Sequence, residues 1–417
     1  MNNDTFRPDF NRPYQNAIVG AYWPGDLDYA YREGFMQATL ALLAVAAAGS
    51  YTDPDTNEVN YASVDALVYP ICFNARHFIE LFMKDSIRIA STLGVNPDQP
   101  GTLATHNLTD LWIQFEKAIK RDNRLEKLGA PLKKIFHDIA SVDNTGMTFR
   151  YSRDLDEKTH LSEFEHINLS VLGDKLREMF NQTEDFSIQL TVLQDEYSQK
   201  TFMNHLHREK IEAIAKQLPP RKNWGKDLEA IKKEICDDFS LTSNKFSKAL
   251  KLIQKHREFC TLIDLELPLE GLPIDIFTRL ARIHDKKDTH TIITKDEWLR
   301  LDAVMEISRL QSYSEEYDPY LQHISSADYE GRFDPEHIAR NAYARNQRLR
   351  NGLVKLGQRT LLDALAKAIP HLAEPLKIPP RLTKEELSAL TDGALQRLKS
   401  RLTSPPEPMG GQESDPE

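Results

Sequence analysis

The chain has 417 residues, which at roughly 100–200 residues per domain predicts two or three domains, each with a full hydrophobic core. It carries 63 acidic and 53 basic side chains, so its formal charge of −10 excludes a general nucleic-acid coat protein. Any contact with nucleic acid therefore needs a local basic patch. The three cysteines, Cys72, Cys236 and Cys260, exclude a disulfide framework and a cysteine-rich zinc site and indicate a reducing compartment.

The apolar stretches of the chain are short. The longest, at 40–48, falls well below the roughly 20 residues that span a bilayer, so it predicts a buried helix and no membrane partner. The first residues lack a basic region followed by an apolar one, so no secretion signal is expected. We therefore expect a soluble, cytoplasmic protein.

Apolar residues recur at spacings of three and four, and strand-like alternation is rare, which predicts an all-α fold of several helical bundles. An irregular stretch is expected at 143–166. The helices expected in the first part of the chain lie at 28–48, 63–91, 107–128, 131–142 and 168–181. They are long enough to form an N-terminal bundle.

Proline-rich breaks mark the later part of the chain. The sequence LPPRKNW at 218–224 interrupts a second helical region, because proline cannot continue a helix. A helix is expected from 334 to about 367. A short one should begin at Thr383, which has capping-box spacing with Glu386. The expected parts are an N-terminal domain at 1–183, a second helical domain at 184–333, C-terminal helices at 334–403 and a disordered tail at 404–417.

Two neighbouring segments predict a helical hairpin. In the first, at 69–91, Glu80 and Lys84 stand four apart and predict an ion pair on the exposed flank. The second begins near 105, with Thr105 or Asn107 as its N-cap. The buried stripe of the first helix is expected to consist of Ile71, Ala75, Phe78, Phe82 and Ile89.

This hairpin, an E-x-x-x-K helix followed by T-H-x-L-x-x-L, resembles the central hairpin of HEPN domains. The matching residues are Glu80, Lys84, Thr105, His106, Leu108 and Leu111, with a weaker likeness at Phe149, Arg150 and Tyr151. The resemblance covers about 60–180, under half of the chain. It implies a dimeric helical domain associated with nucleic acid, of the kind found in bacterial toxin, RNA-processing and phage-defence systems.

The resemblance also implies metal-independent RNA cleavage by an arginine followed closely by a histidine. Histidine would act as general acid or base, while arginine stabilises charge on the phosphate. Pairs with suitable spacing are Arg153 and His160, Arg279 and His284, and Arg332 and His337. Only the first follows the hairpin, so we expect Arg153 and His160 to be the catalytic pair, although three acidic residues between them oppose phosphate. His106 by itself is interpreted as a helix-start residue that bonds locally.

The segment 235–256 resembles a helix-turn-helix unit. Its expected buried residues are Phe239, Leu241, Phe246 and Leu250. The second helix would present Lys245, Lys248 and Lys251 to nucleic acid, with Asn244 near its start. Against this, Ser240 replaces the usual turn glycine, and Asp237 and Asp238 would face phosphate. Simple packing of paired helices remains the alternative.

The segment 337–362 holds six basic residues and no acidic one. On one continuous helix Arg345, Arg348, Lys355 and Arg359 would form a basic stripe suited to phosphate, although Gly352 could break that helix. The alternative interpretations are a solvated helix face and a partner for acidic segments such as 312–320. No cofactor motif is present, and the paired histidines near 205 and 284 lack further ligands, so neither a cofactor nor a metal is expected.

Three hypotheses for function follow. The first is a HEPN-like protein that acts on or senses RNA or DNA in a bacterial toxin or phage-defence system, as a metal-independent endoribonuclease if it is an enzyme. The second is a non-catalytic interaction protein that forms a homodimer or binds a partner encoded nearby. The third is a DNA-binding regulator that uses the segment 235–256.

Overall fold

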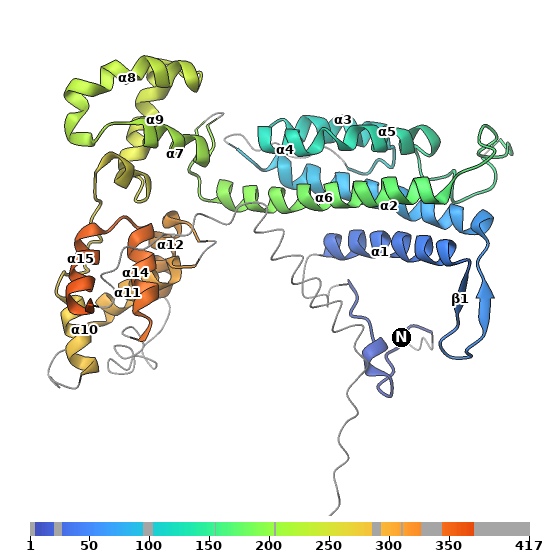
Figure 1. Ribbon diagram of the computed structural model, residues 1–417, viewed down its shortest axis with the longest axis horizontal. Coiled ribbons are helices and arrows are strands. Elements are labelled where there is room, and N and C mark those ends of the chain that lie inside the picture. Colours follow the sequence, from blue (N-terminus) through green and yellow to red (C-terminus); the bar gives the residue numbers. More distant parts are fainter. Residues whose placement is uncertain are drawn as a thin grey trace, which may run out of the picture. The chain divides into compact units, whose positions relative to one another are not determined.

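The computed structural model describes residues 5–20, 27–94, 103–154, 156–203, 206–285, 293–309, 312–326 and 344–370. Within these ranges the chain is helical apart from a two-stranded sheet, which confirms the predicted all-α fold (Figure 1). Two compact units are present, Met1–Asp195 and Glu196–Glu417. No helix in the described ranges is long and apolar enough to cross a membrane.

The first unit is a bundle around one long helix, α2. Its elements are α1 (Leu27–Ala48), β1 (Ser50–Thr52), β2 (Val59–Tyr61), α2 (Val64–Ser91), α3 (Leu108–Ile119), α4 (Asn123–Gly129), α5 (Leu132–Val142) and α6 (Leu169–Ser198). The strands form an antiparallel hairpin between α1 and α2. In Figure 1, α1 runs along one side of α2, while α3 and α5 lie on the other side.

Aromatic side chains hold this bundle together. The ring of Phe82 on α2 lies 5.8 Å from Phe115 on α3, 6.0 Å from Phe136 on α5 and 5.5 Å from Phe186 on α6, measured between centroids. Aromatic rings bury large areas and favour tilted or edge-to-face packing at such distances. One side chain of α2 thus contacts three other helices. Of the predicted buried stripe, only Ile89 is half-buried rather than buried.

The predicted helices of this unit are largely confirmed, with two differences. The segment 107–128 is divided into α3 and α4, because the buried side chain of Asp122 accepts a hydrogen bond from the Arg124 amide and starts a new helix. The predicted helix at 168–181 continues to Ser198. The expected domain end at 183 therefore lies inside a continuous helix.

The second unit contains two neighbouring cores. One is built by α7 (Arg208–Gln217), α8 (Trp224–Asp238), α9 (Ser243–Lys255) and the short helix η4 (Phe259–Ile263). The other is built by α10 (Ile276–His284), α11 (Lys295–Ile307), α12 (Tyr317–Ser326), α14 (Asn346–Lys355) and α15 (Arg359–Ala368). The 3-10 helices η3 (Arg221–Asn223) and η5 (Ser314–Glu316) connect helices within the unit.

Two glycines shape the last helices, and they correct the prediction of one continuous helix to about 367. Gly352 lies inside α14, where a Cβ atom would meet the Val304 carbonyl oxygen of α11 at 1.9 Å, so it permits close helix packing. Gly357 has φ +69° and stands between α14 and α15, where it ends the first helix. The expected helix start at 334, the capping box of Thr383 and Glu386, and the tail at 404–417 lie outside the described residues.

Candidate functional site

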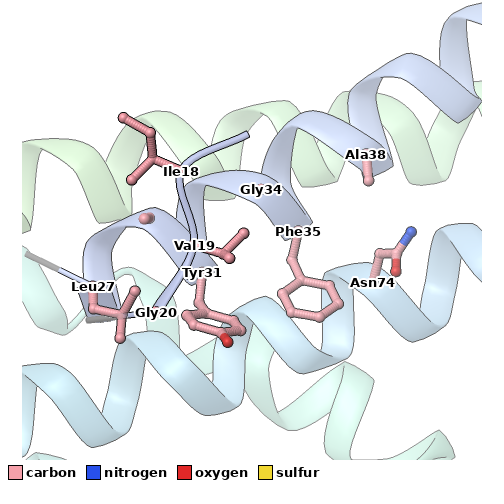
Figure 2. A pocket seen from close by; sticks show the side chains of 10 residues that line it. Ile18, Val19, Gly20, Leu27, Tyr31, Gly34, Phe35, Ala38 and Asn74 are labelled. Atoms are coloured by element: carbon pink, nitrogen blue, oxygen red, sulfur yellow. The ribbon is translucent and has the colours of Figure 1, made fainter. Parts of the chain in front are cut away.

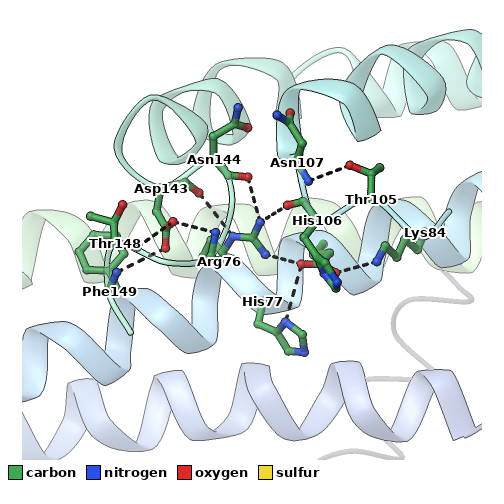
Figure 3. Close-up of polar contacts among 12 residues, drawn as sticks. Arg76, His77, Lys84, Thr105, His106, Asn107, Asp143, Asn144, Thr148 and Phe149 are labelled. Carbon is green, nitrogen blue, oxygen red and sulfur yellow. Dashed lines mark hydrogen bonds and ion pairs between the residues drawn. The ribbon is translucent and has the colours of Figure 1, made fainter. Parts of the chain in front are cut away.

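A polar cluster of the first unit, which includes Arg76, Lys84 and His106 (Figure 3), surrounds the carboxylate of Glu80. Arg76, Glu80 and Lys84 stand at i, i+4 and i+8 on α2 and therefore share one face. One carboxylate oxygen accepts a hydrogen bond from Arg76, and the other lies 2.7 Å from Lys84 Nζ. The side chains of Arg76 and Glu80 are 2 % and 3 % exposed. The predicted ion pair of Glu80 with Lys84 is thus present, but its acid is buried and does not lie on an exposed flank.

Arg76 joins α2 to two loops. Its guanidinium donates to the backbone carbonyl oxygens of His106, Asp143 and Asn144. The Asp143 carboxylate in turn accepts the Gly146 and Thr148 amides at 2.8 and 3.2 Å. A buried arginine thus binds three loop carbonyl oxygens, which fixes both loops against α2.

His106 is the exposed member of this cluster. The next residue, Asn107, caps α3 by accepting the Asp110 amide, as the sequence predicted. His106 Nδ1 lies 2.7 Å from Glu80 Oε1, while its side chain is 68 % exposed. The interpretation of His106 as a residue that bonds locally is therefore wrong, because its side chain and carbonyl both bind α2 across the hairpin.

Burial and hydrogen bonding act in opposite directions on Glu80. Burial raises its pKa, but hydrogen bonds from Lys84, Arg76 and His106 outweigh burial and lower the pKa to about 2. The carboxylate is thus ionised at neutral pH and accepts a proton of His106 through Nδ1. Neutral imidazole then carries its lone pair on Nε2, which is the arrangement of a positioned general base.

His77 lies on the other side of the same carboxylate. Its Nδ1 is 3.9 Å from Glu80 Oε2, and its ring meets Phe35 of α1 edge-on with centroids 4.4 Å apart. Burial lowers the pKa of His77, although Glu80 opposes that shift. His77 is therefore a largely neutral contact between α1 and α2, whereas His106 faces solvent.

Among the described residues, no hydrogen bond or ion pair joins the side chains of the predicted catalytic pair, Arg153 and His160. Arg153 pairs with Thr159 across a short bridge, and its guanidinium donates to the Glu157 carbonyl oxygen at 3.3 Å. His160 follows Thr159, and its amide donates to Ser152. Arg153 is exposed, whereas His160 is half-buried and its Nε2 atom is shielded from solvent, so the two side chains differ in their access to solvent. Their catalytic role stays a prediction.

The two helices joined by a tight turn that were predicted at 235–256 are present. The helices α8 and α9 are joined by a tight turn in which Ser240 has φ +53°, the conformation for which a glycine was expected. Thr242 caps α9. Leu241, Phe246 and Leu250 are buried, whereas Phe239 is half-buried, so that part of the prediction is wrong. The first helix is also longer than predicted, since it starts at Trp224.

A row of basic side chains lies on the outer face of α9. Lys248 and Lys251 are exposed and stand three apart, and Lys255, which was not among the predicted contact residues, continues the row four residues later. Within the described ranges, none of these three lysines has an acidic partner within 4 Å. Lys245 is half-buried at the edge of the row. Asn244 is exposed in the first turn.

The predicted basic stripe of Arg345, Arg348, Lys355 and Arg359 does not exist as one stripe, because the helix ends at Lys355 and restarts at Arg359. Lys355 Nζ donates to the carbonyl oxygens of Arg309 and Ser312. Arg359 binds Asp264 and the Thr261 carbonyl oxygen. Arg345 and Arg348 are exposed on the first turns of α14. Two of the four cations are therefore engaged in intramolecular contacts.

A second buried cluster lies between the two cores of the second unit, and no sequence pattern predicted it. Arg208 Nε lies 2.9 Å from Glu315 Oε1, and its guanidinium also binds Glu258. It is stacked between the rings of Phe259 and Tyr313, 4.7 and 5.1 Å from their centroids. His256 Nε2 lies 2.8 Å from the same Glu315 oxygen.

The described residues hold no group of three or more histidine, cysteine, aspartate or glutamate side chains placed to bind a metal ion. Cys72, Cys236 and Cys260 are free thiols, and burial raises the pKa of each, that of Cys72 to about 12.

No known protein family, curated protein or solved structure matches the chain.

Proposed function

We propose that the protein binds duplex nucleic acid and that the outer face of α9 makes the contact. The observation that carries the proposal is the row of Lys248, Lys251 and Lys255, which has no acidic partner among the described residues. Phosphates attract such cations, and release of condensed counterions from a duplex favours their binding. Because the chain as a whole is acidic, it needs a local group of basic side chains such as this row to bind phosphate.

Two further features of α9 support this proposal. Phe246, Ala249 and Ile253 bury the opposite face of the helix in the core, so the lysine row is held outward on a fixed support. A tight turn joins α8 to α9, and in helix-turn-helix proteins the second of two helices so joined enters the major groove. Asp237 and Asp238, exposed at the end of α8, would disfavour phosphate beside that turn. Contact is therefore expected along α9 rather than at the end of α8.

The test compares two triple variants of the full chain. Replacing Lys248, Lys251 and Lys255 by alanine should weaken duplex binding and reduce the slope of log K against log salt concentration by about one per lysine. The control replaces Lys222, Lys226 and Lys233, exposed lysines of η3 and α8, and removes the same charge from the same unit. Equal effects of the two triples would reject α9 as the contact.

A second candidate is the metal-independent RNA cleavage implied by the HEPN resemblance, in a bacterial toxin or phage-defence setting. It is supported by the exposed imidazole of His106 on the ionised Glu80 carboxylate. In such a reaction the ribose 2′-oxygen attacks phosphorus and gives its proton to His106 Nε2. The bond from phosphorus to the 5′-oxygen breaks, and that oxygen takes a proton from water.

RNA cleavage in EDTA distinguishes His106 from the pair selected by sequence. If His106 is the base, His106→Ala abolishes cleavage, while Arg153→Ala and His160→Ala retain it. Loss of cleavage only in the last two variants would favour the sequence-based pair. A wild-type protein that neither cleaves RNA nor binds duplex would favour the interaction-protein hypothesis.

A reducing, cytoplasmic compartment suits every one of these hypotheses, since the three thiols are free.

A further inference from the structure

A pocket lies beside the start of α12 in the second unit. Its volume is about 590 Å³, which is within the range of pockets that hold small organic molecules. Two arginines, a tyrosine and an apolar wall line it, namely Arg257, Arg300, Tyr317, Leu267 and Pro268. Arg300 comes from α11 and Tyr317 from α12, whereas Arg257 follows α9. The fold thus brings two cations and a phenol from separate parts of the chain to one hollow.

A groove beside α1 in the first unit has a different character. Its volume is about 450 Å³, and Figure 2 shows Ile18, Val19, Tyr31, Phe35 and Asn74 around it. The described residues that line this groove include no charged side chain. Of these two hollows, the pocket beside α12 is therefore the one that offers charged groups to select a ligand.

The buried hydroxyl of Tyr317 is a donor without an acceptor. The residue is 2 % exposed, and among the described residues no group accepts the proton of its hydroxyl. Arg257 lies over its ring, 5.4 Å from the centroid, and the charge of Arg300 acts on its hydroxyl. A guanidinium only donates hydrogen bonds, so neither arginine supplies the acceptor. Because an unpaired buried donor is unfavourable, an anion bound beside the hydroxyl would stabilise it.

The charges around this hydroxyl favour an anion. Burial raises the pKa of Tyr317 above its ordinary value, and the neighbouring charges act on it in both directions. Arg300 and Arg257 each lower this pKa more than Asp318 raises it. Positive charge therefore dominates at the hydroxyl, which favours a negatively charged ligand there.

Three carboxylates also line the pocket, those of Glu270, Glu315 and Asp318. Glu315 is already bound by Arg208 and by two hydroxyl groups. Asp318 pairs with Arg257 at 3.2 Å, but its side chain is 64 % exposed. Exposed ion pairs contribute little, so exchange of this carboxylate for a ligand costs little free energy. Glu270 is exposed to solvent, which screens its charge.

Arg300 is held in place by two neighbours. Its Nε and Nη2 atoms lie 3.0 and 3.3 Å from the carboxylate of Asp296, one turn earlier on α11. Its guanidinium lies against the backbone of Gly271, where a Cβ atom would come within 2.5 Å of Nε. Gly271 also has φ +77°, a conformation that favours glycine. The arginine is thus positioned in advance, and its third nitrogen is left for a ligand.

We propose that this pocket binds a small organic oxyanion, a carboxylate or a phosphate ester, through Arg257, Arg300 and the Tyr317 hydroxyl. Both kinds of anion present oxygens that match a planar guanidinium. The remaining volume, with Leu267 and Pro268 as its apolar wall, accommodates the organic part of the ligand. The proposal does not depend on duplex binding, because neither arginine belongs to the lysine row of α9. Lys255 belongs to both surfaces, so it is left unchanged in the test.

The test is equilibrium dialysis of the full chain in a buffer of low chloride concentration, with inorganic phosphate in one arm and succinate in the other. At least one of these anions should bind the wild type with a Kd of about 1 mM or below. The anion that binds more tightly identifies the class of ligand. Absence of binding in both arms at about 10 mM would overturn the proposal.

Two variants remove donors from the pocket. Arg300→Gln should weaken binding by at least about tenfold, because a charge-assisted hydrogen bond is lost. Tyr317→Phe should weaken it by about three- to tenfold and leave thermal unfolding unchanged, since the hydroxyl has no acceptor in the unliganded protein. A purely structural role of Tyr317 predicts no effect on binding. Equal binding by the wild type and both variants would indicate an adventitious ion only and would overturn the proposal.

A third variant should increase affinity. Asp318→Asn releases Arg257 from its ion pair and removes a negative charge from the pocket, so it should strengthen binding several-fold. The control is Arg309→Gln, which removes an exposed arginine of the same unit that does not line the pocket and should leave binding unchanged. A loss of binding in Arg309→Gln equal to that in Arg300→Gln would show a general effect of charge and contradict a defined site.

Discussion

Each unit of the protein contains an Arg–Glu–His cluster around one carboxylate, and the two clusters differ in where the histidine lies. In the first unit Arg76 and Glu80 are buried while the His106 side chain is 68 % exposed. In the second unit Arg208 is buried and the His256 side chain is only 6 % exposed, stacked on Phe259 at 3.8 Å. The first cluster leaves an imidazole available to react, whereas the second uses its imidazole as packing.

The hydrogen bonds of the two histidines agree with this difference. His256 Nδ1 accepts the Phe259 amide, so its proton is on Nε2, which faces Glu315. Nε2 is buried 2.8 Å from Glu315 Oε1, so neither ring nitrogen is available to a ligand. His106 engages only Nδ1. The same three residue types therefore give a structural junction in one unit and a candidate reactive site in the other, and exposure of the second ring nitrogen distinguishes them.

The largest effect is expected from removal of either buried arginine. Arg76→Ala and Arg208→Ala should each lower the free energy of unfolding of their own unit by about 3–5 kcal/mol, because a buried carboxylate loses its cation. Hydrogen-exchange mass spectrometry under denaturant measures the unfolding of α2 and that of α7 separately. The control Arg309→Ala removes an exposed arginine paired with Glu306 and should cost under about 1 kcal/mol. A similar loss of unfolding free energy in all three variants would contradict the stabilising role of the two buried arginines.

Acid should weaken the first cluster. The pKa of Glu80 is lowered to about 2 from 4.5, so the stabilisation is fully present above about pH 4.5 and is lost as the pH falls towards 2. A shift of that size corresponds to roughly 3 kcal/mol. Exchange protection of α2 measured from pH 6 to pH 3 should fall in the wild type. Glu80→Gln should start less stable and show a flatter dependence on pH. The same slope in both proteins would mean that Glu80 is not the responsible group.

The smallest effects separate the two histidines. His256→Ala should cost about 2–3 kcal/mol, since the Phe259 amide loses its acceptor and a buried ring contact is lost. His106→Ala should cost under about 1 kcal/mol, because only one hydrogen bond of an exposed side chain is removed. Thermal unfolding of the two variants checks this. Equal losses would make His106 a structural residue and weaken its candidacy as a base.

The sequence by itself determined the helices and the local turns. Spacings of three and four located α1, α2, α5 and α9 to within a few residues. The N-cap of α3 was predicted to be Thr105 or Asn107, and it is Asn107. These features depend on contacts between residues close in the chain, so a local pattern contains the information. The tight turn before α9 was predicted as well, although a serine takes the conformation expected of a glycine.

Only the tertiary structure decided which polar groups are available. Arg76 and Glu80 look like surface residues of a helix, but loops from 106 and 143 cover them. The sequence predicts a helical lysine at both 355 and 251. Lys355 donates to carbonyl oxygens of a segment distant in the chain, whereas Lys251 is exposed. The burial and the partners of a side chain depend on segments that are far apart in the chain. Helical periodicity does not specify those contacts, because it indicates only which face of a helix is apolar.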